Sequence, residues 1–348
     1  MIMKSNFPLS LLLLFTFATT SWSGDPAVTD VAQVDPAYHY LGEYVGDWHG
    51  SPAGVQVSTR KGDKPFYAKL FQGGLPGAGW NGAEPQIFTG SMAGSQLLLA
   101  DTGDSVQLDV NPNTVTLTSA AARAEFRKVA RRSVTLGLAP PPGAKVLFDG
   151  KDISNFKSAK ITSEGLLAAG AETKDPIGSC RIHLEFRTPY MPFSEDQKRG
   201  NSGVYIQRRY EVQILESFGQ DCVFNGCGAL YRQRKPNFNM SLPPLVWQTY
   251  DIFFTAARFD ADGKRTSPAQ ISVIQNGVPV HYRAAIETKT GAGKPEGPEA
   301  LPMLLQDHSD PIVYRNVWIL PMADGSVAQP SSATSKSAFN AQRQQAGL

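Results

Sequence analysis

The chain has 348 residues, and 33 Lys and Arg against 31 Asp and Glu leave a formal charge of only +2. A charge so nearly balanced provides no basic stripe, so we expect no nucleic-acid partner. Gly and Pro are frequent, at 32 and 25 residues, and 41% of the residues are hydrophobic. This composition predicts a turn-rich protein with well-filled cores, of a length typical of two domains.

The N-terminus carries the one strongly apolar run of the sequence. Lys4 precedes residues 9–18, which are mostly Leu, Phe and Ala, and Ser21 and Ser23 follow. A run of about ten residues is too short for the ~20 that span a bilayer, which disfavours a retained anchor. Residues 1–23 therefore predict a signal peptide, cleaved after Ser23. We expect export to the periplasm or the extracellular space, and no membrane span.

Residues 36–137 predict a small β-rich N-terminal domain. Short runs between turn residues indicate half-buried strands at residues 54–58, 66–71, 96–100, 105–110 and 114–118. Residues 119–132 are ambiguous, because residues 120–124 favour a helix by propensity while the apolar stripe is too narrow to establish one. The role of this domain is left open, as an accessory module or a docking surface.

Residues 138–145 predict a Pro-rich linker, and residues 146–321 a second β domain. Its expected strands are residues 182–188, 203–207, 210–216, 249–256, 271–275, 278–282, 303–306 and 312–320. Asn276-Gly277 predicts a type I′ hairpin, because both central residues of that turn need a positive φ. So many short strands indicate two packed antiparallel sheets, hence an all-β protein. Residues 322–348 are poor in large apolar side chains, and we expect a disordered tail there.

The chain has three cysteines, and an exported protein can form disulfides. Cys222 and Cys227 bracket four residues and could close a short disulfide, which would leave Cys180 over. No Cys-x-x-Cys or Cys/His spacing indicates zinc. The sequence does not decide whether the disulfide forms.

Strand parity sorts the side chains of the second domain into two faces. Val204 and Ile206 alternate with Tyr205 and Gln207, and Val212 and Ile214 alternate with Glu211 and Gln213. The two runs keep their apolar faces together only if one strand continues or the connection has an odd length. The polar face could simply meet water, but its amides, carboxylate and aromatic ring are also typical of a sugar-binding cleft.

Two further motifs are candidates for the same site. The tight loop of residues 199–203 contains Asn201, and Gln306, Asp307 and His308 follow a predicted strand. His308 is the best acid–base candidate among five histidines, because a neighbouring carboxylate can tune its pKa toward neutrality. Either motif could instead be ordinary turn chemistry. Phosphate-loop, G-x-S-x-G, H-E-x-x-H and dinucleotide motifs are missing from the sequence, so no cofactor is predicted by motif.

Six segments follow one another along residues 145–321: VLFDGKDISNF, RGNSGVYIQRRYEVQILESFG, CGALY, PPLVWQTYDIFF, QNGVPV and LLQDHSDPIVYRNVWI. Together they resemble the 3-keto-disaccharide hydrolase domain family, also described as 3-keto-glucoside 1,2-lyase and 3-keto-2-hydroxy-glucal hydratase. The resemblance implies a concanavalin A-like jelly-roll sandwich, which agrees with the strand pattern. Two positions depart from the family's pattern: Arg208 stands where a turn glycine is expected, and Ser241 where a cysteine is expected.

The chemistry implied by the resemblance is an elimination. A ketone at C3 of a sugar acidifies the C2 hydrogen, so a base can expel the C1 substituent, and water then adds to the enone. This route needs a base, an acid and donors for an enolate, but no nicotinamide. A separate sugar 3-oxidoreductase is therefore expected upstream to make the 3-keto-glycoside substrate.

The resemblance and the polar face together suggest roles for particular residues. Glu211 is the expected base, His308 and Asp307 are the expected acid or relay, and Glu185 is a reserve carboxylate. The expected substrate-binding residues are Asn201, Tyr205, Gln207, Gln213, Tyr231, Trp247, Gln306 and Arg315, although Trp247 could equally belong to a core.

Three alternatives stay open at this point. A jelly roll also serves non-catalytic lectin-like carbohydrate-binding modules. Glu185 and Glu211 could act as the carboxylate pair of a conventional glycosidase. A divalent metal held by Glu and His could replace direct donors, but no ligand spacing establishes one.

Overall fold

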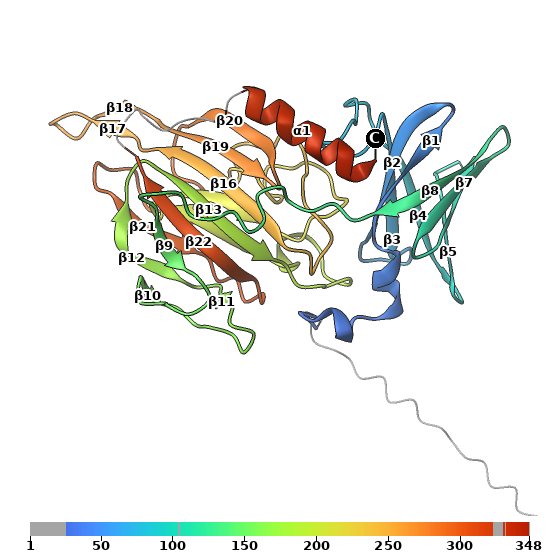
Figure 1. Ribbon diagram of the computed structural model, residues 1–348, viewed down its shortest axis with the longest axis horizontal. Helices are drawn as coiled ribbons and strands as arrows, with labels where there is room; N and C mark the ends of the chain where they lie inside the picture. The colour runs from blue at the N-terminus through green and yellow to red at the C-terminus, as the bar shows by residue number, and fades with distance from the viewer. Residues whose placement is uncertain (1–25, 104, 323–329, 331, 348) are drawn as a thin grey trace, which may run out of the picture.

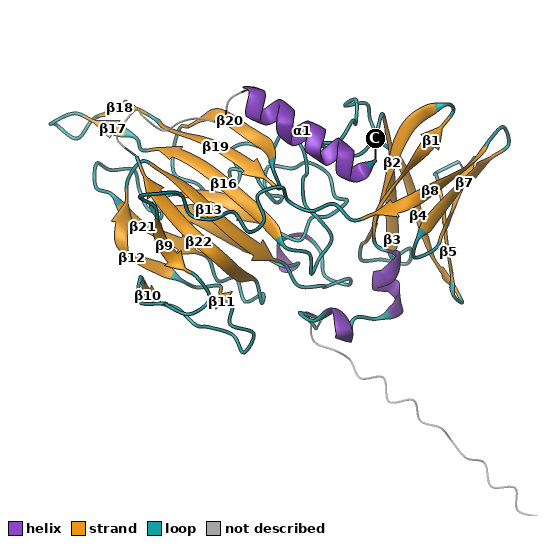
Figure 2. Cartoon of the chain, viewed as in Figure 1, coloured by secondary structure: helices purple, strands orange, loops and turns teal. Residues whose placement is uncertain are grey.

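The computed structural model describes residues 26–103, 105–322, 330 and 332–347, so the predicted signal peptide lies outside the described residues. The fold is all-β, as expected. A closed barrel and a two-sheet sandwich stand side by side, and one helix, α1 (Ser332–Ala346), lies over the sandwich and ends at the barrel (Figures 1 and 2). None of the helices among the described residues is both long and apolar enough to cross a bilayer.

The N-terminal body is an eight-stranded antiparallel barrel in which β8 closes on β1. Its strands are β1 (Gly42–Trp48), β2 (Ser51–Thr59), β3 (Phe66–Gln72), β4 (Gln86–Ala93), β5 (Gln96–Ala100), β6 (Val106–Val110), β7 (Thr114–Ser119) and β8 (Arg123–Val129). The ambiguous segment is thus a strand. Tyr44, Phe88 and Phe126 are fully buried inside the barrel. Two short 3-10 helices, η1 (Val31–Gln33) and η2 (Pro36–Tyr40), precede it.

The second body is a sandwich of two antiparallel sheets, as predicted. The five-stranded sheet has the order β10 (Phe156–Ser158), β12 (Glu172–Ile177), β21 (Leu301–Leu305), β14 (Ser202–Ile206) and β15 (Tyr210–Ile214). The seven-stranded sheet has the order β11 (Leu167–Ala168), β22 (Val313–Pro321), β13 (Cys180–Arg187), β16 (Gln248–Thr255), β19 (Ala269–Gln275) and β20 (Val278–Ile286), with β9 (Lys145–Phe148) paired to β22. A small ribbon, β17 (Arg258–Phe259) with β18 (Arg265–Ser267), lies apart. One continuous hydrophobic core fills the space between the two sheets.

Two connections fix the registers. Residues 207–209 join β14 to β15 with an odd length, as parity demanded, so Tyr205 lies opposite Glu211 and Gly203 opposite Gln213. The hairpin at Asn276 is also confirmed, because this residue has a φ of 52° and the next, a glycine, 84°. Both registers keep the apolar residues in the core.

The linker before the sandwich is anchored on the outer face of the seven-stranded sheet. Oε1 of Glu185 accepts hydrogen bonds from the backbone N–H of Gly137, at 2.6 Å, and from Nδ2 of Asn316, at 3.0 Å. Its Oε2 accepts one from Nε of Arg315, at 2.7 Å. Asn316 also donates to the carbonyl of Leu138, at 3.1 Å. Glu185 therefore holds the linker and does not face a cleft.

The expectation of a disordered tail is wrong for residues 332–346, which form α1. Buried Gln342 donates to the carbonyl oxygens of Asn276, at 3.0 Å, and Arg132, at 3.3 Å, and Ala346 is fully buried. The helix thus gains its stability from docking, because its own polar composition would not sustain it in isolation.

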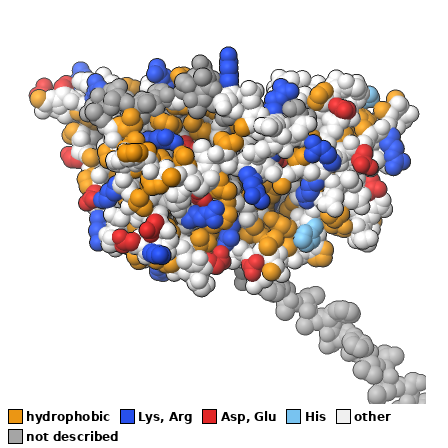
Figure 3. Space-filling view, viewed as in Figure 1, with side chains coloured by type: hydrophobic (Ala, Val, Ile, Leu, Met, Phe, Trp, Pro, Cys, Tyr) orange, Lys and Arg blue, Asp and Glu red, His pale blue; other side chains and the backbone are white. Residues whose placement is uncertain are grey.

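Barrel and sandwich are joined through a buried arginine. Arg199, from the sandwich, donates to the carbonyl of Thr59 at 2.8 Å and to its Oγ1 at 3.1 Å, and forms an ion pair with Glu216. A second contact between the domains joins β3 of the barrel to a loop of the sandwich, where Nζ of Lys69 lies 2.5 Å from Oδ1 of Asp221. Elsewhere on the face seen in Figure 3, acidic and basic side chains are interspersed among hydrophobic ones, as expected for a balanced charge.

The three cysteines are free thiols, so the possible disulfide between Cys222 and Cys227 does not form. The sulfur of Cys227 points inward, 3.2 Å from the hydroxyl of Tyr250, whereas Cys222 is only partly buried in the loop. Cys227 also hydrogen-bonds with Ser241, the position at which the family's cysteine was expected.

We predict that Ser241→Cys creates a disulfide with Cys227, because the two side chains are already in contact. Closing a loop of roughly 15 residues should stabilise the fold by about 3 kcal/mol. Thermal unfolding with and without reductant, together with thiol counting, checks this. An unchanged midpoint of thermal unfolding, with all four cysteines of the variant counted as free thiols, would contradict it.

We predict that Glu185→Ala destabilises the fold by roughly 3 kcal/mol, because it leaves Arg315 and the linker N–H without their acceptor. Burial opposes ionisation of Glu185, but hydrogen bonds from His183, Asn316, Arg315 and Gly137 outweigh it and lower its pKa to about 2. Its contribution is thus complete above pH ~4.5 and lost as the pH falls toward 2.

Urea unfolding at pH 7 and pH 3 measures this contribution. The matched control is Glu164→Ala, whose half-exposed carboxylate pairs with Arg187 and should cost under about 1 kcal/mol. Equal losses for the two variants would show that the Glu185 network does not anchor the linker.

Candidate functional site

A buried carboxylate occupies the outer face of the five-stranded sheet. Glu211 is 2% exposed, and its Oε2 accepts a hydrogen bond from the hydroxyl of Tyr205, its cross-strand neighbour, at 2.7 Å. The carboxamide of Gln213 lies 3.2 Å from Oε1 of Glu211 and 2.6 Å from the carbonyl of Ser202, so its nitrogen, turned to this side, donates to both. Parity thus brings Tyr205, Glu211 and Gln213 together, as the sequence indicated.

Two glycines make room for the carboxylate. A Cβ on Gly203 would collide with Oε1 of Glu211. A Cβ on Gly291 would lie 2.8 Å from the ring of Tyr231 and 3.3 Å from Oε2 of Glu211. The ring of Tyr231 therefore lies close to the carboxylate of Glu211. The loop that contains Gly291 is held to β15 by Thr290, whose hydroxyl accepts a hydrogen bond from the backbone N–H of Glu211 at 2.6 Å.

The environment of Glu211 disfavours its charged form. Burial raises the pKa of Glu211 to about 7, and the hydrogen bond from Tyr205 opposes this only in part. In turn, burial and the charge of Glu211 raise the pKa of Tyr205 well above its usual value. A carboxyl group that titrates near neutrality beside a neutral phenol can exchange a proton at physiological pH.

A row of polar side chains leads from this carboxylate to the loop after β21. The amides of Gln213 and Gln197 are 2.9 Å apart, and Nδ2 of Asn201 donates to the carbonyl of Gln197 at 2.8 Å. The backbone N–H of Asn201 donates to Oδ2 of Asp310 at 2.7 Å. His308 is exposed but lies close enough for its charge to lower the pKa of Asp310, against the larger raising effect of burial.

Gln197 also opens this chain to a cavity. The cavity has a volume of about 470 Å³ and lies between the turn after β2 and the sandwich loops around η3 (Asp196–Lys198). Arg60 and Lys64 line it from the barrel, and Glu195 and Asn225 from the sandwich. Its size suits a small molecule of one or two sugar units.

Other residues of the predicted site turn elsewhere. Gln207 lies in the turn, and its amide donates to the carbonyl of Ile177 at 2.8 Å, so it does not share the face of Glu211. Asp307 accepts from the N–H of its neighbour Ser309 and packs over Gly170. Gln306 lies at the end of β21, where its backbone, not its side chain, pairs with β14.

Three residues of the predicted site lie on the other side of the sandwich. Glu185 and Arg315 form the linker anchor. The guanidinium of Arg315 stacks over Trp247, with its Cζ 4.0 Å from the centroid of the Trp247 ring. Since Glu185 and Glu211 face away from the core on opposite sheets, the two carboxylates cannot flank one glycosidic bond within the ~10 Å that a glycosidase pair requires. The conventional glycosidase built on this pair is therefore excluded.

Four contributors escaped the sequence analysis: Gln197, Thr290, Gly291 and Asp310. The first and last flank the two motifs that were identified, so a search within a few residues of those motifs could have found them. The loop at 290–291 has no strand period and nothing local to indicate what it covers. Among the described residues, no group of three or more His, Cys, Asp or Glu side chains could hold a metal ion.

A family model matches the part of the chain that forms the sandwich. Residues 143–320, just over half of the chain, match the 3-keto-alpha-glucoside-1,2-lyase-like domain family. A candidate glycosyl hydrolase from Parabacteroides distasonis is 33% identical, covers 52% of this chain and 85% of its own, and has a TM-score of 0.48. A second from that organism is 17% identical, covering 52% and 94%, with a TM-score of 0.38.

No curated protein sequence matches the chain significantly. The family match includes the strands β14, β15 and β21 and the loops that assemble around Glu211. The chain belongs to the family of 3-keto-alpha-glucoside-1,2-lyase-like domains.

Proposed function

We propose that the sandwich domain cleaves 3-keto-glycosides by elimination and hydration, with Glu211 as the general base. The observation that carries this proposal is the buried carboxyl group of Glu211, whose pKa of about 7 suits it to accept a proton at neutral pH. Family membership supports the substrate class.

The reaction balances in two steps. Glu211 takes the proton from C2, the C2–H electron pair forms the enolate of the C3 ketone, and the enolate collapses with cleavage of the C1–O bond. The leaving oxygen takes a proton and departs as an alcohol. Water then adds its hydroxyl to C1 and returns a proton to C2, so the net result is hydrolysis without oxidation or reduction.

The remaining polar groups suit the other tasks. The amide of Gln213 and the hydroxyl of Tyr205 hydrogen-bond with the carboxylate, and would turn to the enolate oxygen as Glu211 takes the proton; the ring of Tyr231 lies beside the same carboxylate. We assign the acid role to His308, supported by Asp310 rather than by Asp307. Substrate would enter from the cavity that Gln197 lines.

Two properties of the wider pathway belong to the same proposal. The elimination uses no nicotinamide, so a separate sugar 3-oxidoreductase would supply the ketone. The apolar run and small residues within residues 1–23 support export of the enzyme.

A lectin-like binding module is the competing function for this fold. The two functions are distinguished by incubating the protein with a glucoside and with its 3-keto form. Release of the aglycone from the keto form alone supports elimination, whereas binding of both sugars without product would replace the proposal with the module.

We predict that Glu211→Gln lowers kcat/KM for the 3-keto-glucoside by at least ~100-fold, because general base catalysis contributes about that much. In the wild type, kcat/KM should rise with pH toward a plateau above about 7, since the base acts only when ionised. Rates that are unchanged in the variant, or independent of pH, would reject Glu211 as the base.

A stability measurement separates this role from misfolding. Because folding raises the pKa of Glu211 from 4.5 to about 7, the native state binds the extra proton, and its stability falls by roughly 3 kcal/mol as the pH rises from about 4.5 to 7. Glu211→Gln should therefore lose this pH dependence and be relatively more stable at pH 8 than the wild type.

We further predict that Gly203→Ala lowers kcat at least tenfold although it removes no functional group, because its Cβ displaces the carboxylate of Glu211. Gly178→Ala is the matched control: a Cβ there meets nothing within 4 Å, and φ is not positive. Kinetics of both variants with the 3-keto-glucoside provide the test. Equal activity would show that the position of the carboxylate does not matter.

A further inference from the structure

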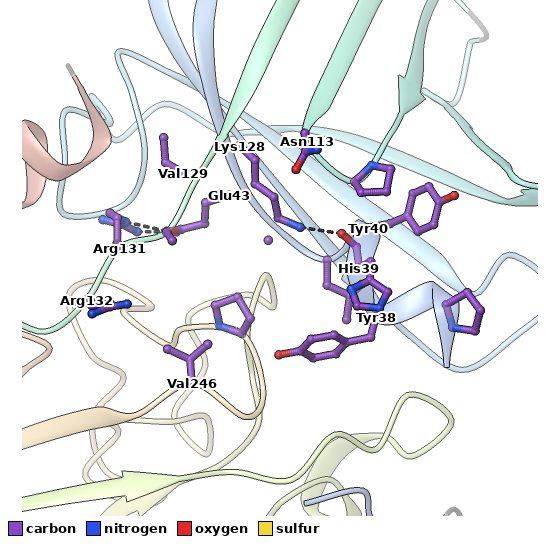
Figure 4. A pocket seen from close by; sticks show the side chains of 16 residues that line it. Tyr38, His39, Tyr40, Glu43, Asn113, Lys128, Val129, Arg131, Arg132 and Val246 are labelled. Atoms are coloured by element: carbon purple, nitrogen blue, oxygen red, sulfur yellow. Dashed lines mark hydrogen bonds and ion pairs between the residues drawn. The ribbon is translucent and has the colours of Figure 1, made fainter. Parts of the chain in front are cut away.

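A second cavity lies between the barrel and the sandwich, apart from Glu211. Its volume is about 620 Å³, within the ~300–1,000 Å³ of small-molecule sites. Its walls come from η2, from β8 and the turn before β7, and from residues 243–246 of the sandwich (Figure 4). Ligand sites favour such positions between domains.

Lys128, for which the described part of the chain offers no carboxylate partner, reaches into this cavity. Nζ of Lys128 donates to the carbonyl of His39 at 2.6 Å and lies over the ring of Tyr44, 5.5 Å from its centroid. A Cβ on Gly42 would lie 2.7 Å from Cε of Lys128, so the glycine makes room for this side chain. Two N–H groups of the ammonium remain for a ligand.

The other charges of the lining leave the cavity positive. Glu43 is the one acidic residue among the described residues that line it, and its Oε2 accepts a hydrogen bond from Nε of Arg131 at 2.6 Å. Both partners of that pair are buried. Arg132, which is exposed, adds a second positive charge to the lining. A bound anion would therefore neutralise the positive charges of Lys128 and Arg132, for which no acidic partner is found among the described residues.

The rest of the lining combines apolar surface with hydrogen-bonding groups. Tyr38 and Val246 face the same space in Figure 4, and three prolines add rigid apolar surface. Asn113 and His39 contribute an amide and an imidazole. A ring that carries both hydroxyl groups and a carboxylate matches this combination, whereas a bare inorganic anion would leave the apolar walls unused.

We propose that this cavity binds an acidic saccharide, in which the carboxylate of a uronate unit pairs with Lys128 and its ring packs between Tyr38 and Val246. The site is independent of Glu211 and of the elimination. Burial lowers the pKa of Lys128 to about 8, so the ammonium still predominates at pH 7.

The test is calorimetric titration of the full chain at pH 7 and low salt with three probes: α-1,4-linked digalacturonate, the matched neutral digalactose, and benzoate. We expect digalacturonate to bind one site per chain, at least tenfold more tightly than either other probe. Failure to bind digalacturonate, equal binding of digalactose, or equal binding of benzoate would overturn the acidic-saccharide assignment.

Variants locate the site. Lys128→Met should weaken digalacturonate binding about tenfold or more, because a charge-assisted hydrogen bond is lost. Arg123→Met removes a charge from an exposed position of the same strand and should not change it. Val246→Trp fills the cavity from the sandwich side and should abolish binding even if Lys128→Met folds poorly. Unchanged affinity in Val246→Trp would overturn the site, and Glu211→Gln must bind normally if the two sites are independent.

Discussion

The buried guanidinium of Arg199 is the constraint on which the arrangement of the two bodies and of the candidate site depends. A buried charge persists only when it is paired and hydrogen-bonded, and Arg199 meets this condition through Glu216 in its own domain and Thr59 in the barrel. The next residues along the chain lead to Asn201, which hydrogen-bonds with Gln197. The contact that joins the domains therefore also positions the loop beside the candidate reaction centre, so an isolated sandwich would lack part of that support.

Two glutamates of similar sequence context have pKa values that are shifted in opposite directions. Glu185 and Glu211 both alternate with apolar residues on a strand and both are buried. Several donors converge on Glu185 and hold it ionised, whereas Glu211 accepts a hydrogen bond from a phenol and has a pKa of about 7, so its protonated and ionised forms coexist near neutral pH. Such a separation of pKa values distinguishes a carboxylate that holds structure together from one suited to proton transfer.

Much of the sandwich could be predicted because its information is local. The Asn276 hairpin follows from the turn's own backbone requirement, and parity alone placed Tyr205, Glu211 and Gln213 on one face. In the barrel, strands β1 and β4 were not predicted, because their glycines interrupt the apolar pattern that tertiary packing completes. Loop closure over Glu211 and the docking of α1 depend on contacts distant in sequence, which no local pattern encodes.

The position of α1 has a mechanical consequence. The chain leaves the barrel through the linker held by Glu185, forms the sandwich, and returns so that the end of α1 touches the barrel again, where Arg127 donates to the carbonyl of Ala346 at 3.2 Å (Figure 1). The sandwich is thus clasped at both of its ends. A hinge motion at one connection would require the contacts at the other connection to break. We therefore expect the barrel and the sandwich to tumble in solution as one rigid particle, and to stay associated even if the linker alone is cleaved.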